Sequence, residues 1–316
     1  MTRIDSAKCA ALLKENDNFL ILAHANPDGD TLGSAFALHR ILSVCGKKSA
    51  VRCADEIHGK YSYLFDDIDN GDIEFDKIIA VDVADKSLLG DGFAALYGDR
   101  VFLCIDHHMS NRQYSEYLLL EERAATAEII YKLAGALGVE TSGKIADCIY
   151  TGIATDTGCF MFSNTTPDTH RIAAEMIEKG ADYALINRAM FETKTLSYLR
   201  LEQMAVSSIE LKFGGKCAVM TITQDMFRES GSNESECDGI AALPRKIEGV
   251  SIGITVRERK DGSYKVSLRT VEPYDAAEIC AKLGGGGHNR AAGCEFYCPL
   301  DETKAVLLDA VKAALV

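Results

Sequence analysis

A histidine and two aspartates lie close together in one short segment near the N-terminus. His24 follows the apolar run Phe19–Ala23, and Asp28 and Asp30 come next, around a proline and a glycine that favour a compact turn. Three ligand-type side chains at this spacing would repel one another or stay unpaired unless a cation lay among them. We therefore predict half of a metal site in this segment.

Further side chains that can bind metal ions follow the other apolar runs of the chain. Asp82 comes directly after the run Lys77–Val81, the triplet Asp106-His107-His108 closes the next run, and Asp156 ends a helical pattern. Because the carboxyl ends of parallel strands meet at one edge of a sheet, we expect these side chains to gather there. The candidate metal ligands are His24, Asp28, Asp30, Asp82, His107 and Asp156.

The chemistry of this candidate set indicates the kind of metal site. Nitrogen and oxygen ligands without thiolates suit manganese, iron, cobalt, zinc or magnesium, and several imidazoles argue against magnesium alone. The set is too large for one catalytic ion with open positions. It fits two ions that share a carboxylate, as in two-metal phosphoester hydrolysis, and Asp82 is the natural bridge.

Each of these features alone has a simpler interpretation. An Asp-Gly-Asp segment is usually a turn, Asp82 could cap a helix, and a His-His pair is often structural. Their combination at successive strand ends favours the metal site. His39, His58 and His170 have no such neighbours, and we expect them to be structural.

The elements that must position these residues follow an alternating pattern. Strand-like apolar runs alternate with helix-like segments from the N-terminus to about residue 190, which predicts an α/β domain with a mostly parallel sheet and helices on both faces. We place this metal-binding domain at 1–190, a linker helix at 191–205, and a smaller mixed α/β domain at 206–316. The linker would let a cleft between the domains open and close.

The C-terminal part contains hairpin signals and a glycine run. Asp261-Gly262 predicts a two-residue turn, which would pair Arg269 with Ile254 and place Arg257 on the opposite face. Only one of the two arginines can then line the substrate site without a bulge. The glycines before His288 would let the backbone approach an anion closely, although flexible loops of this kind are common.

The bulk composition limits the classes of function. A length of 316 residues suggests two domains, and a net charge of −13 argues against binding of long nucleic acid. Because no apolar run approaches the roughly 18 residues of a membrane span and the N-terminus lacks a signal peptide, we expect a cytoplasmic protein without a membrane partner. The eleven cysteines are scattered, and we expect them to be reduced.

Taken in order, these motifs resemble those of the DHH phosphoesterases. The segment His24–Asp30, Asp82, Asp106-His107-His108 and Thr151–Gly158 look like the four motifs of that family, and Gly284–His288 resembles the signature of its associated C-terminal nucleotide-binding domain. The resemblance covers nearly the whole chain. It is nearest to the bifunctional oligoribonucleases, or nanoRNases, which also dephosphorylate 3′-phosphoadenosine 5′-phosphate.

The resemblance implies a role for each motif residue. His24, Asp28 and Asp82 would hold one divalent cation, and Asp30, Asp82, His107 and Asp156 a second; Mn2+ is the expected ion, with Mg2+, Co2+ or Fe2+ as alternatives. His108 would face the scissile phosphate, supported by Asp106 and Asn111. The residues implied to act in catalysis are His108, Asp106 and Asp82. Those implied to bind substrate are His108, Asn111, Arg269, Gly285, Gly286, Gly287 and His288. The family resemblance in the string Ser267-Leu268-Arg269 favours Arg269, which leaves Arg257 as a solvated surface charge.

The expected activity is hydrolysis of short oligonucleotides to mononucleotides and of the nucleotide bisphosphate to AMP. The alternatives are a phosphodiesterase acting on linear or cyclic dinucleotides, an exopolyphosphatase-like enzyme, and a regulatory protein that binds nucleotides without catalysis. Related enzymes are often dimers, so a homodimer is also an expectation. The sequence does not rank substrate length, base or sugar.

Overall fold

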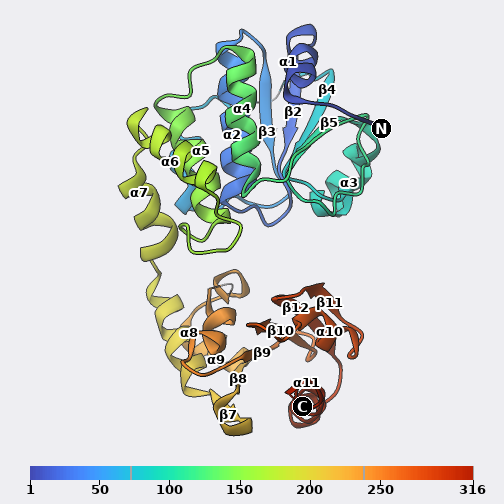
Figure 1. Cartoon of the computed structure of the whole chain (residues 1–316), viewed down its shortest axis with the longest axis vertical. Coiled ribbons are helices and arrows are strands. Elements are labelled where there is room, and N and C mark those ends of the chain that lie inside the picture. The colour runs from blue at the N-terminus through green and yellow to red at the C-terminus, as the bar shows by residue number, and fades with distance from the viewer. Residues whose placement is uncertain (72, 238, 316) are drawn as a thin grey trace. The chain divides into compact units, whose positions relative to one another are not determined.

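The computed structural model describes residues 1–71, 73–237 and 239–315. The chain forms two compact units, Met1–Thr193 and Lys194–Val316, which are described separately (Figure 1). The strands of the first unit are β1 (Thr2–Arg3), β2 (Phe19–Leu22), β3 (Ser49–Arg52), β4 (Lys77–Val81), β5 (Val101–Asp106) and β6 (Tyr117–Leu120). Its helices are α1 (Ser6–Glu15), α2 (Gly29–Val44), α3 (Asp91–Tyr97), α4 (Thr126–Leu137), α5 (Lys144–Asp156), α6 (Pro167–Glu178) and α7 (Tyr183–Asn187).

The first unit is built on a parallel sheet, as predicted. Its six strands are ordered β1-β6-β5-β4-β2-β3, and each neighbouring pair is parallel. From β2 the chain passes first to β3 on one side and then to β4 on the other. The strand order therefore reverses between β2 and β4, and ligands of open α/β sheets bind beyond the carboxyl ends of the strands at such a point.

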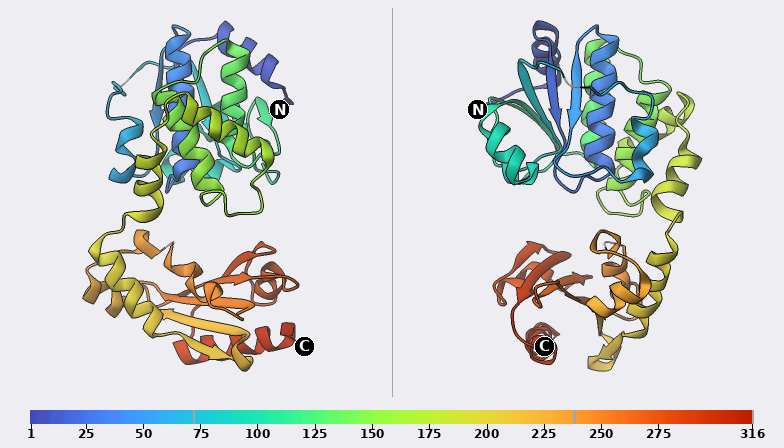
Figure 2. Two further views of the ribbon diagram at one scale, coloured as in Figure 1. Left: turned by 60° about the vertical axis from the view of Figure 1, so that its left-hand side comes forward. Right: turned by 180° about the vertical axis from the view of Figure 1, so that it is seen from behind.

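Alternating side chains of β2 enter two hydrophobic cores. Phe19 and Ile21 lie in the larger core with residues of α1, α2, α4 and α5, whereas Leu20 and Leu22 lie in the smaller core, against which α3 packs. The views in Figures 1 and 2 agree that α3 covers the sheet face opposite α2 and α4. Burial on both faces explains why these strands are continuous apolar runs in the sequence.

Helices α2 and α5 approach each other closely beside the predicted site. A β-carbon on Gly33 would lie 2.4 Å from the carbonyl oxygen of Cys148, and one on Gly152 would lie 2.6 Å from Asp30 Oδ1. Only glycine leaves room for this approach. The packing brings the end of α5, which carries Asp156, to the start of α2.

The second unit is a mixed α/β fold. Its helices are α8 (Leu196–Ser207), α9 (Gln224–Ser230), α10 (Ala276–Ala281) and α11 (Leu300–Leu315). Its strands are β7 (Glu210–Lys212), β8 (Cys217–Ile222), β9 (Ile252–Glu258), β10 (Tyr264–Thr270), β11 (Gly286–His288) and β12 (Ala291–Phe296). They form one sheet in the order β11-β12-β10-β9-β8-β7, in which only β8 and β9 pair in parallel among the described strands.

The segment at 191–205, predicted as a linker helix, is divided between the two units. A π-helical turn, Arg188–Glu192, ends the helical part of the first unit. Helix α8 then starts at Leu196 with Thr195 as its N-cap, and its Leu201 and Ala205 are buried with Met220 in a core of the second unit. Most of this segment therefore belongs to the second unit.

The hairpin of β9 and β10 differs from the prediction in register. The loop holds three residues rather than two, because Arg259 N donates to Ser263 O (2.8 Å) and Gly262 takes a positive φ of 81°. Arg269 consequently pairs with Gly253, and Arg257 with Lys265. This shift of one residue puts Arg257 and Arg269 on the same face of the sheet, so the predicted opposite placement was wrong.

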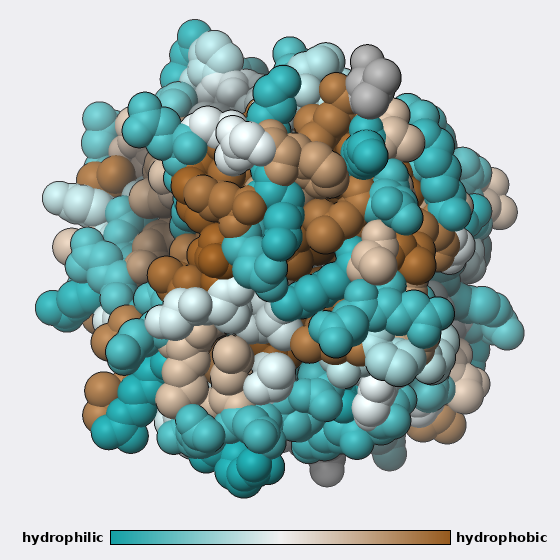
Figure 3. Space-filling view, turned by 90° about the horizontal axis from the view of Figure 1, so that it is seen from below, coloured by the Kyte–Doolittle hydropathy of each residue, from teal (hydrophilic) through white to brown (hydrophobic). Residues whose placement is uncertain are grey.

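Two further observations concern the chain as a whole. All eleven cysteines are free thiols, as predicted, and no helix among the described residues is long and apolar enough to cross a membrane. The face of the molecule in Figure 3 carries patches of hydrophobic residues interrupted by hydrophilic ones.

Candidate metal centre

His24 and Asp28 are fixed by the turn that joins β2 to α2. Asp28 is the N-cap of α2, and its Oδ1 accepts hydrogen bonds from the backbone amides of Asp30 (3.0 Å) and Thr31 (3.1 Å). His24 Nδ1 lies 2.8 Å from the carbonyl oxygen of Ala25. Because a carbonyl can only accept, Nδ1 carries the proton, and the lone pair on Nε2 faces Asp28 at 3.6 Å. This is the tautomer that a metal ligand requires.

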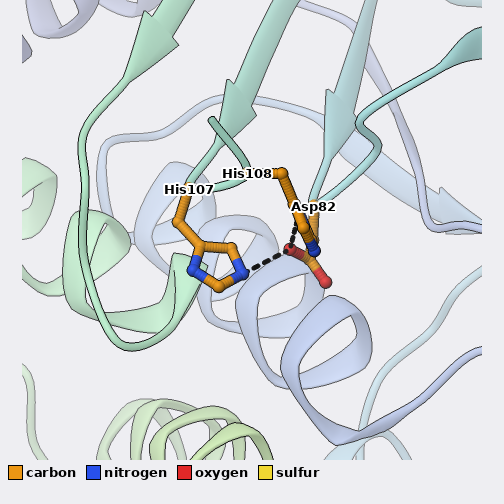
Figure 4. Close-up of side chains that lie close together, drawn as sticks. All are labelled: Asp82, His107 and His108. Carbon is orange, nitrogen blue, oxygen red and sulfur yellow. Dashed lines mark ion pairs between the residues drawn. The ribbon is translucent and has the colours of Figure 1, made fainter. Parts of the chain in front are cut away.

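Asp82 lies at the centre of the candidate site and is almost fully buried. Its backbone has a φ of 61°, an unfavourable conformation for a residue with a side chain, and its amide donates to the carbonyl oxygen of Ile105 at 2.9 Å. The carboxylate lies near three imidazoles: Oδ2 is 3.8 Å from His24, and Oδ1 is 3.7 Å from His107 and 3.5 Å from His108. Figure 4 shows His107 and His108 converging on it.

Asp30 and His107 are held by the loop and helix that follow β6. Asp30 belongs to the first turn of α2, and its buried carboxylate contacts the start of α4. There Oδ2 accepts from the amide of Thr126 (2.7 Å) and Oδ1 from the amide of Ala127 (3.0 Å). His107 Nδ1 lies 3.0 Å from the carbonyl oxygen of Arg123, which leaves Nε2 free to face Asp156 at 3.7 Å. His107 thus has the same ligand tautomer as His24.

These side chains form three groups that share some members, and within each group the ligand atoms lie within 4.8 Å of one another. The groups are His24 with Asp28 and Asp82; Asp30 with His107 and Asp156; and Asp82 with His107 and His108. All six predicted ligands are therefore brought together. The first two groups match the predicted division between two ions, and Asp82 lies beside both. The assignment of each ligand to an ion stays a prediction.

The charges at this centre are unbalanced without a cation. Burial and repulsion from Asp30 and Asp28 raise the pKa of Asp82 well above its ordinary value. Burial and repulsion from the same two groups raise the pKa of Asp156 to about 8. Carboxylates crowded in this way cannot all ionise unless positive charge is added. The donor set therefore fits divalent cations.

Asp106 supports His108 from within the protein. Asp106 Oδ1 accepts from the amides of His107 (2.9 Å) and His108 (3.2 Å) and from His108 Nδ1 (2.8 Å). Burial opposes ionisation of Asp106, but hydrogen bonds from His108 and Asn111 outweigh it and lower its pKa. The hydrogen bond that His108 Nδ1 donates to Asp106 fixes the ring of His108, whose side chain is 44% exposed.

Asn111 lies where it can support Asp106 but not contact substrate. It is buried, its Nδ2 donates to Asp106 Oδ2 at 2.6 Å, and its Oδ1 accepts from the amide of Gln113 at 2.7 Å. Both polar groups of the side chain are thus occupied within the protein. Of the two roles implied for Asn111, the geometry favours support of the site over substrate binding.

Thr126 and Thr31 are site residues that the sequence analysis missed. Thr126 Oγ1 donates to Asp82 Oδ1 at 2.8 Å, while its backbone amide binds Asp30. Thr31 Oγ1 donates to the carbonyl oxygen of Val81 at 3.0 Å and joins α2 to the end of β4. The available signal was the helical periodicity of residues 124–137, which places Thr126 near the start of a helix.

The predicted substrate residues of the second unit share one face of its sheet. Arg269 and His288 both pair with Ala291 of β12, from β10 and β11 respectively, so their side chains project on the same side. Arg257 is on this face too, but its side chain is only 17% exposed and lies 3.6 Å from Glu234. The expectation that Arg257 is a solvated surface charge was therefore wrong.

The glycine run has a structural reason in addition to the one predicted. A β-carbon on Gly285 would lie 2.2 Å from the carbonyl oxygen of Gly293, and one on Gly287 would lie 2.6 Å from that of Ala291. These glycines are required for close pairing with β12. Gly284 and Gly286 have open space at their β-carbon positions, so a ligand could approach the run there.

The parallel sheet, the carboxylate and imidazole centre at its edge and the second α/β unit define a phosphoesterase-type fold, and the chain belongs to the DHH family. The profile of the DHH family, N-terminal domain, matches residues 18–153, and that of the DHHA1 domain matches residues 214–316. The family and fold class predicted from the motifs are confirmed.

Particular relatives refine this placement. A Thermus thermophilus protein named bifunctional oligoribonuclease and PAP phosphatase NrnA is 34% identical over 93% of this chain and 89% of its own length. The Bacillus subtilis protein of the same name is 27% identical over 93% of each chain.

Two solved structures share the fold. An exopolyphosphatase-related protein of Bacteroides fragilis aligns over 98% of this chain and 96% of its own, with a TM-score of 0.88 and 24% identity. RecJ of Thermus thermophilus in complex with Mn2+ aligns over 97% of this chain and 55% of its own, with a TM-score of 0.57 and 16% identity.

Proposed function

We propose that this protein is a two-metal phosphoesterase that hydrolyses short oligonucleotides to mononucleotides and 3′-phosphoadenosine 5′-phosphate to AMP. The observation that carries the proposal is the pair of adjacent ligand groups around Asp82, each with an imidazole in the ligand tautomer. The 34% identical Thermus relative, named as an oligoribonuclease and PAP phosphatase, supports the choice of substrates. Mn2+ is the ion we propose, with two bound per chain.

Different residues of the chain have different roles at this centre. Two bound divalent cations supply charge neutralisation on the phosphate and lower the pKa of water. His24, Asp28 and Asp82 hold one ion; the second is held by Asp30, Asp82, His107 and Asp156. Asp106 fixes the ring of His108 through Nδ1, so that Nε2 can donate to a phosphate oxygen when the ring is protonated.

Substrate binding by the second unit is a further part of this proposal. Arg269 and His288 lie on one sheet face, and the open space at Gly286 leaves room for a ligand to approach the backbone. Such groups suit the phosphates and bases of a short nucleotide. The acidic balance of the chain agrees with a short substrate rather than a long nucleic acid.

A substrate panel tests the proposal. Metal-stripped protein, with and without Mn2+, is given the bisphosphate, RNA and DNA dimers to pentamers, cyclic dinucleotides and polyphosphate. We expect Mn2+-dependent release of mononucleotides from the short RNA substrates and of phosphate from the bisphosphate. Turnover confined to cyclic dinucleotides or to polyphosphate would establish one of the other enzymes, and tight nucleotide binding without turnover would indicate a regulatory protein.

A further inference from the structure

A closely held loop that follows the predicted metal ligand Asp156 carries exposed apolar side chains. The loop follows Asp156, the last residue of α5, and returns to it: Asn164 Nδ2 donates to the carbonyl oxygens of Asp156 (3.1 Å) and Ala124 (3.0 Å). Between these two points lie Met161, which is 77% exposed, and Phe162, which is 55% exposed. Both side chains therefore lie within a few residues of a predicted metal ligand.

The backbone of this loop is strained but closely held. Gly158, Cys159 and Phe160 have consecutive positive φ angles of 56°, 56° and 65°, which are unfavourable for the cysteine and the phenylalanine. Thr157 stabilises the turn, because its Oγ1 accepts from the amide of Phe160 at 3.0 Å and its carbonyl accepts from the amides of Met161 (2.9 Å) and Phe162 (3.0 Å). Strain that the surroundings maintain is typical of functional sites.

The aromatic side chains of the loop have different positions. Phe160 is stacked on His170 with 5.0 Å between ring centroids and anchors the loop to the first unit. The ring of Phe162 covers Gly158, where a β-carbon would lie 2.4 Å from its Cζ, yet more than half of Phe162 remains exposed. Phe162 is thus an exposed aromatic side chain on a fixed support.

A third exposed apolar side chain belongs to the segment that follows β5. Met109 follows His108 directly and is 61% exposed; apart from Met1, it and Met161 are the exposed methionines among the described residues. Methionine and phenylalanine both contact flat π-systems favourably. Exposed apolar side chains that can contact a ring therefore lie within a few residues of Asp156 and His108 of the candidate centre.

We propose that Phe162, with Met161 beside it, is the surface on which a base of the substrate stacks while the phosphate lies at the metal centre. This inference rests on the proposed function and names the part of the substrate that the first unit binds. Stacking on a fixed aromatic ring costs little conformational entropy and tolerates every base, because each base has a π-face. Base binding then accompanies the phosphate chemistry on the same unit.

The test compares Phe162→Ala, Phe162→Tyr and wild type on a 5′-phosphorylated RNA dinucleotide and on two analogues that each lack one base. We expect Phe162→Ala to raise KM for the dinucleotide about 5- to 100-fold with kcat retained. For the analogue that lacks the base stacked on Phe162, Phe162→Ala and wild type should have the same KM, because no stacking remains to be lost. Phe162→Tyr should resemble wild type, and Leu96→Ala, which removes an exposed side chain of α3, should change nothing.

Two results would overturn the inference. One is a KM of Phe162→Ala for the dinucleotide equal to that of wild type. The other is an equal rise in KM for the dinucleotide and for both analogues. A change of oligomeric state in Phe162→Ala, seen by size-exclusion chromatography together with such an equal rise, would instead make the loop a subunit contact. Absence of Mn2+-dependent hydrolysis by wild type would refute the proposed function itself, and is distinguishable because no variant is involved.

Discussion

Replacing Thr126 with valine isolates one hydrogen bond at the metal centre. Thr126 Oγ1 donates to Asp82 Oδ1 at 2.8 Å in a fully buried position, and no cavity is created because valine has nearly the same shape. The backbone amide that binds Asp30 is kept in the variant. The change therefore removes a hydrogen bond that orients the carboxylate of Asp82, the predicted bridge, while the predicted ligands all remain.

The expected magnitude follows from the nature of this bond. A hydrogen bond to an ionised group contributes about 1.5–3 kcal/mol, and loss of a group that orients a metal ligand lowers metal affinity about 10- to 100-fold, or about 1.4–2.8 kcal/mol. We expect Thr126→Val to weaken Mn2+ binding within this range. Turnover at saturating Mn2+ should recover toward wild type, because the ligands are intact.

Isothermal titration of metal-stripped protein with Mn2+ measures the affinity, and activity as a function of Mn2+ concentration provides a second readout. Thr126→Ser keeps the hydroxyl group and is the matched control, which should bind Mn2+ like wild type. The reasoning is refuted if Thr126→Val binds Mn2+ as tightly as wild type. It is also refuted if the serine variant is as weak as the valine variant, since the loss would then not come from the hydrogen bond.

The remaining predictions test other parts of the structure. Asp82→Ala should abolish Mn2+-dependent hydrolysis while circular dichroism shows an unchanged fold, and wild-type turnover in that variant would contradict the two-metal scheme. Removal of metal with EDTA should stop hydrolysis, and Mn2+ at 1,000 times its Kd should restore it and stabilise the fold by about 4 kcal/mol for each ion bound, as measured by thermal unfolding. Arg269→Ala should raise KM for dinucleotides but leave hydrolysis of a simple activated phosphodiester nearly intact; equal losses on both would disprove the division between the units. Burial raises the pKa of Glu128 in the folded protein, so ionisation of this side chain opposes folding once the pH exceeds its pKa in the unfolded chain. Glu128→Gln should therefore raise Tm relative to wild type more at pH 8 than at pH 5. A difference in Tm that does not depend on pH would refute this.

Much of the metal centre could be predicted because it follows from local patterns. Strands buried on both faces are continuous apolar runs, so the point where each run meets His24, Asp82 or Asp106 marks the carboxyl end of a strand. The cap of α2 at Asp28 is likewise encoded in adjacent residues. Parallel pairing then gathers these ends without any information on long-range contacts.

Contacts between distant segments could not be predicted in this way. Thr126 binds Asp82 across 44 positions of the chain, and the carbonyl that orients His107 belongs to Arg123 in an irregular segment. Neither contact leaves a periodic signal. The prediction of the register between β9 and β10 was wrong for a different reason. Asp261-Gly262 occurs in two-residue and three-residue loops alike, and one extra loop residue moves the side chains of one strand to the opposite face relative to the other strand.

The two predicted ion sites are built as one structural unit. The start of α4 binds Asp30 through the amides of Thr126 and Ala127, and it binds Asp82 through the Thr126 hydroxyl. Helix α5, which carries Asp156, packs so closely here that a β-carbon on Gly152 would lie 2.5 Å from the β-carbon of Ala127. Predicted ligands of both ions thus depend on the same few atoms of α4. A displacement of this helix start would disturb both predicted ion sites together, so a single shared support would suit two-metal chemistry.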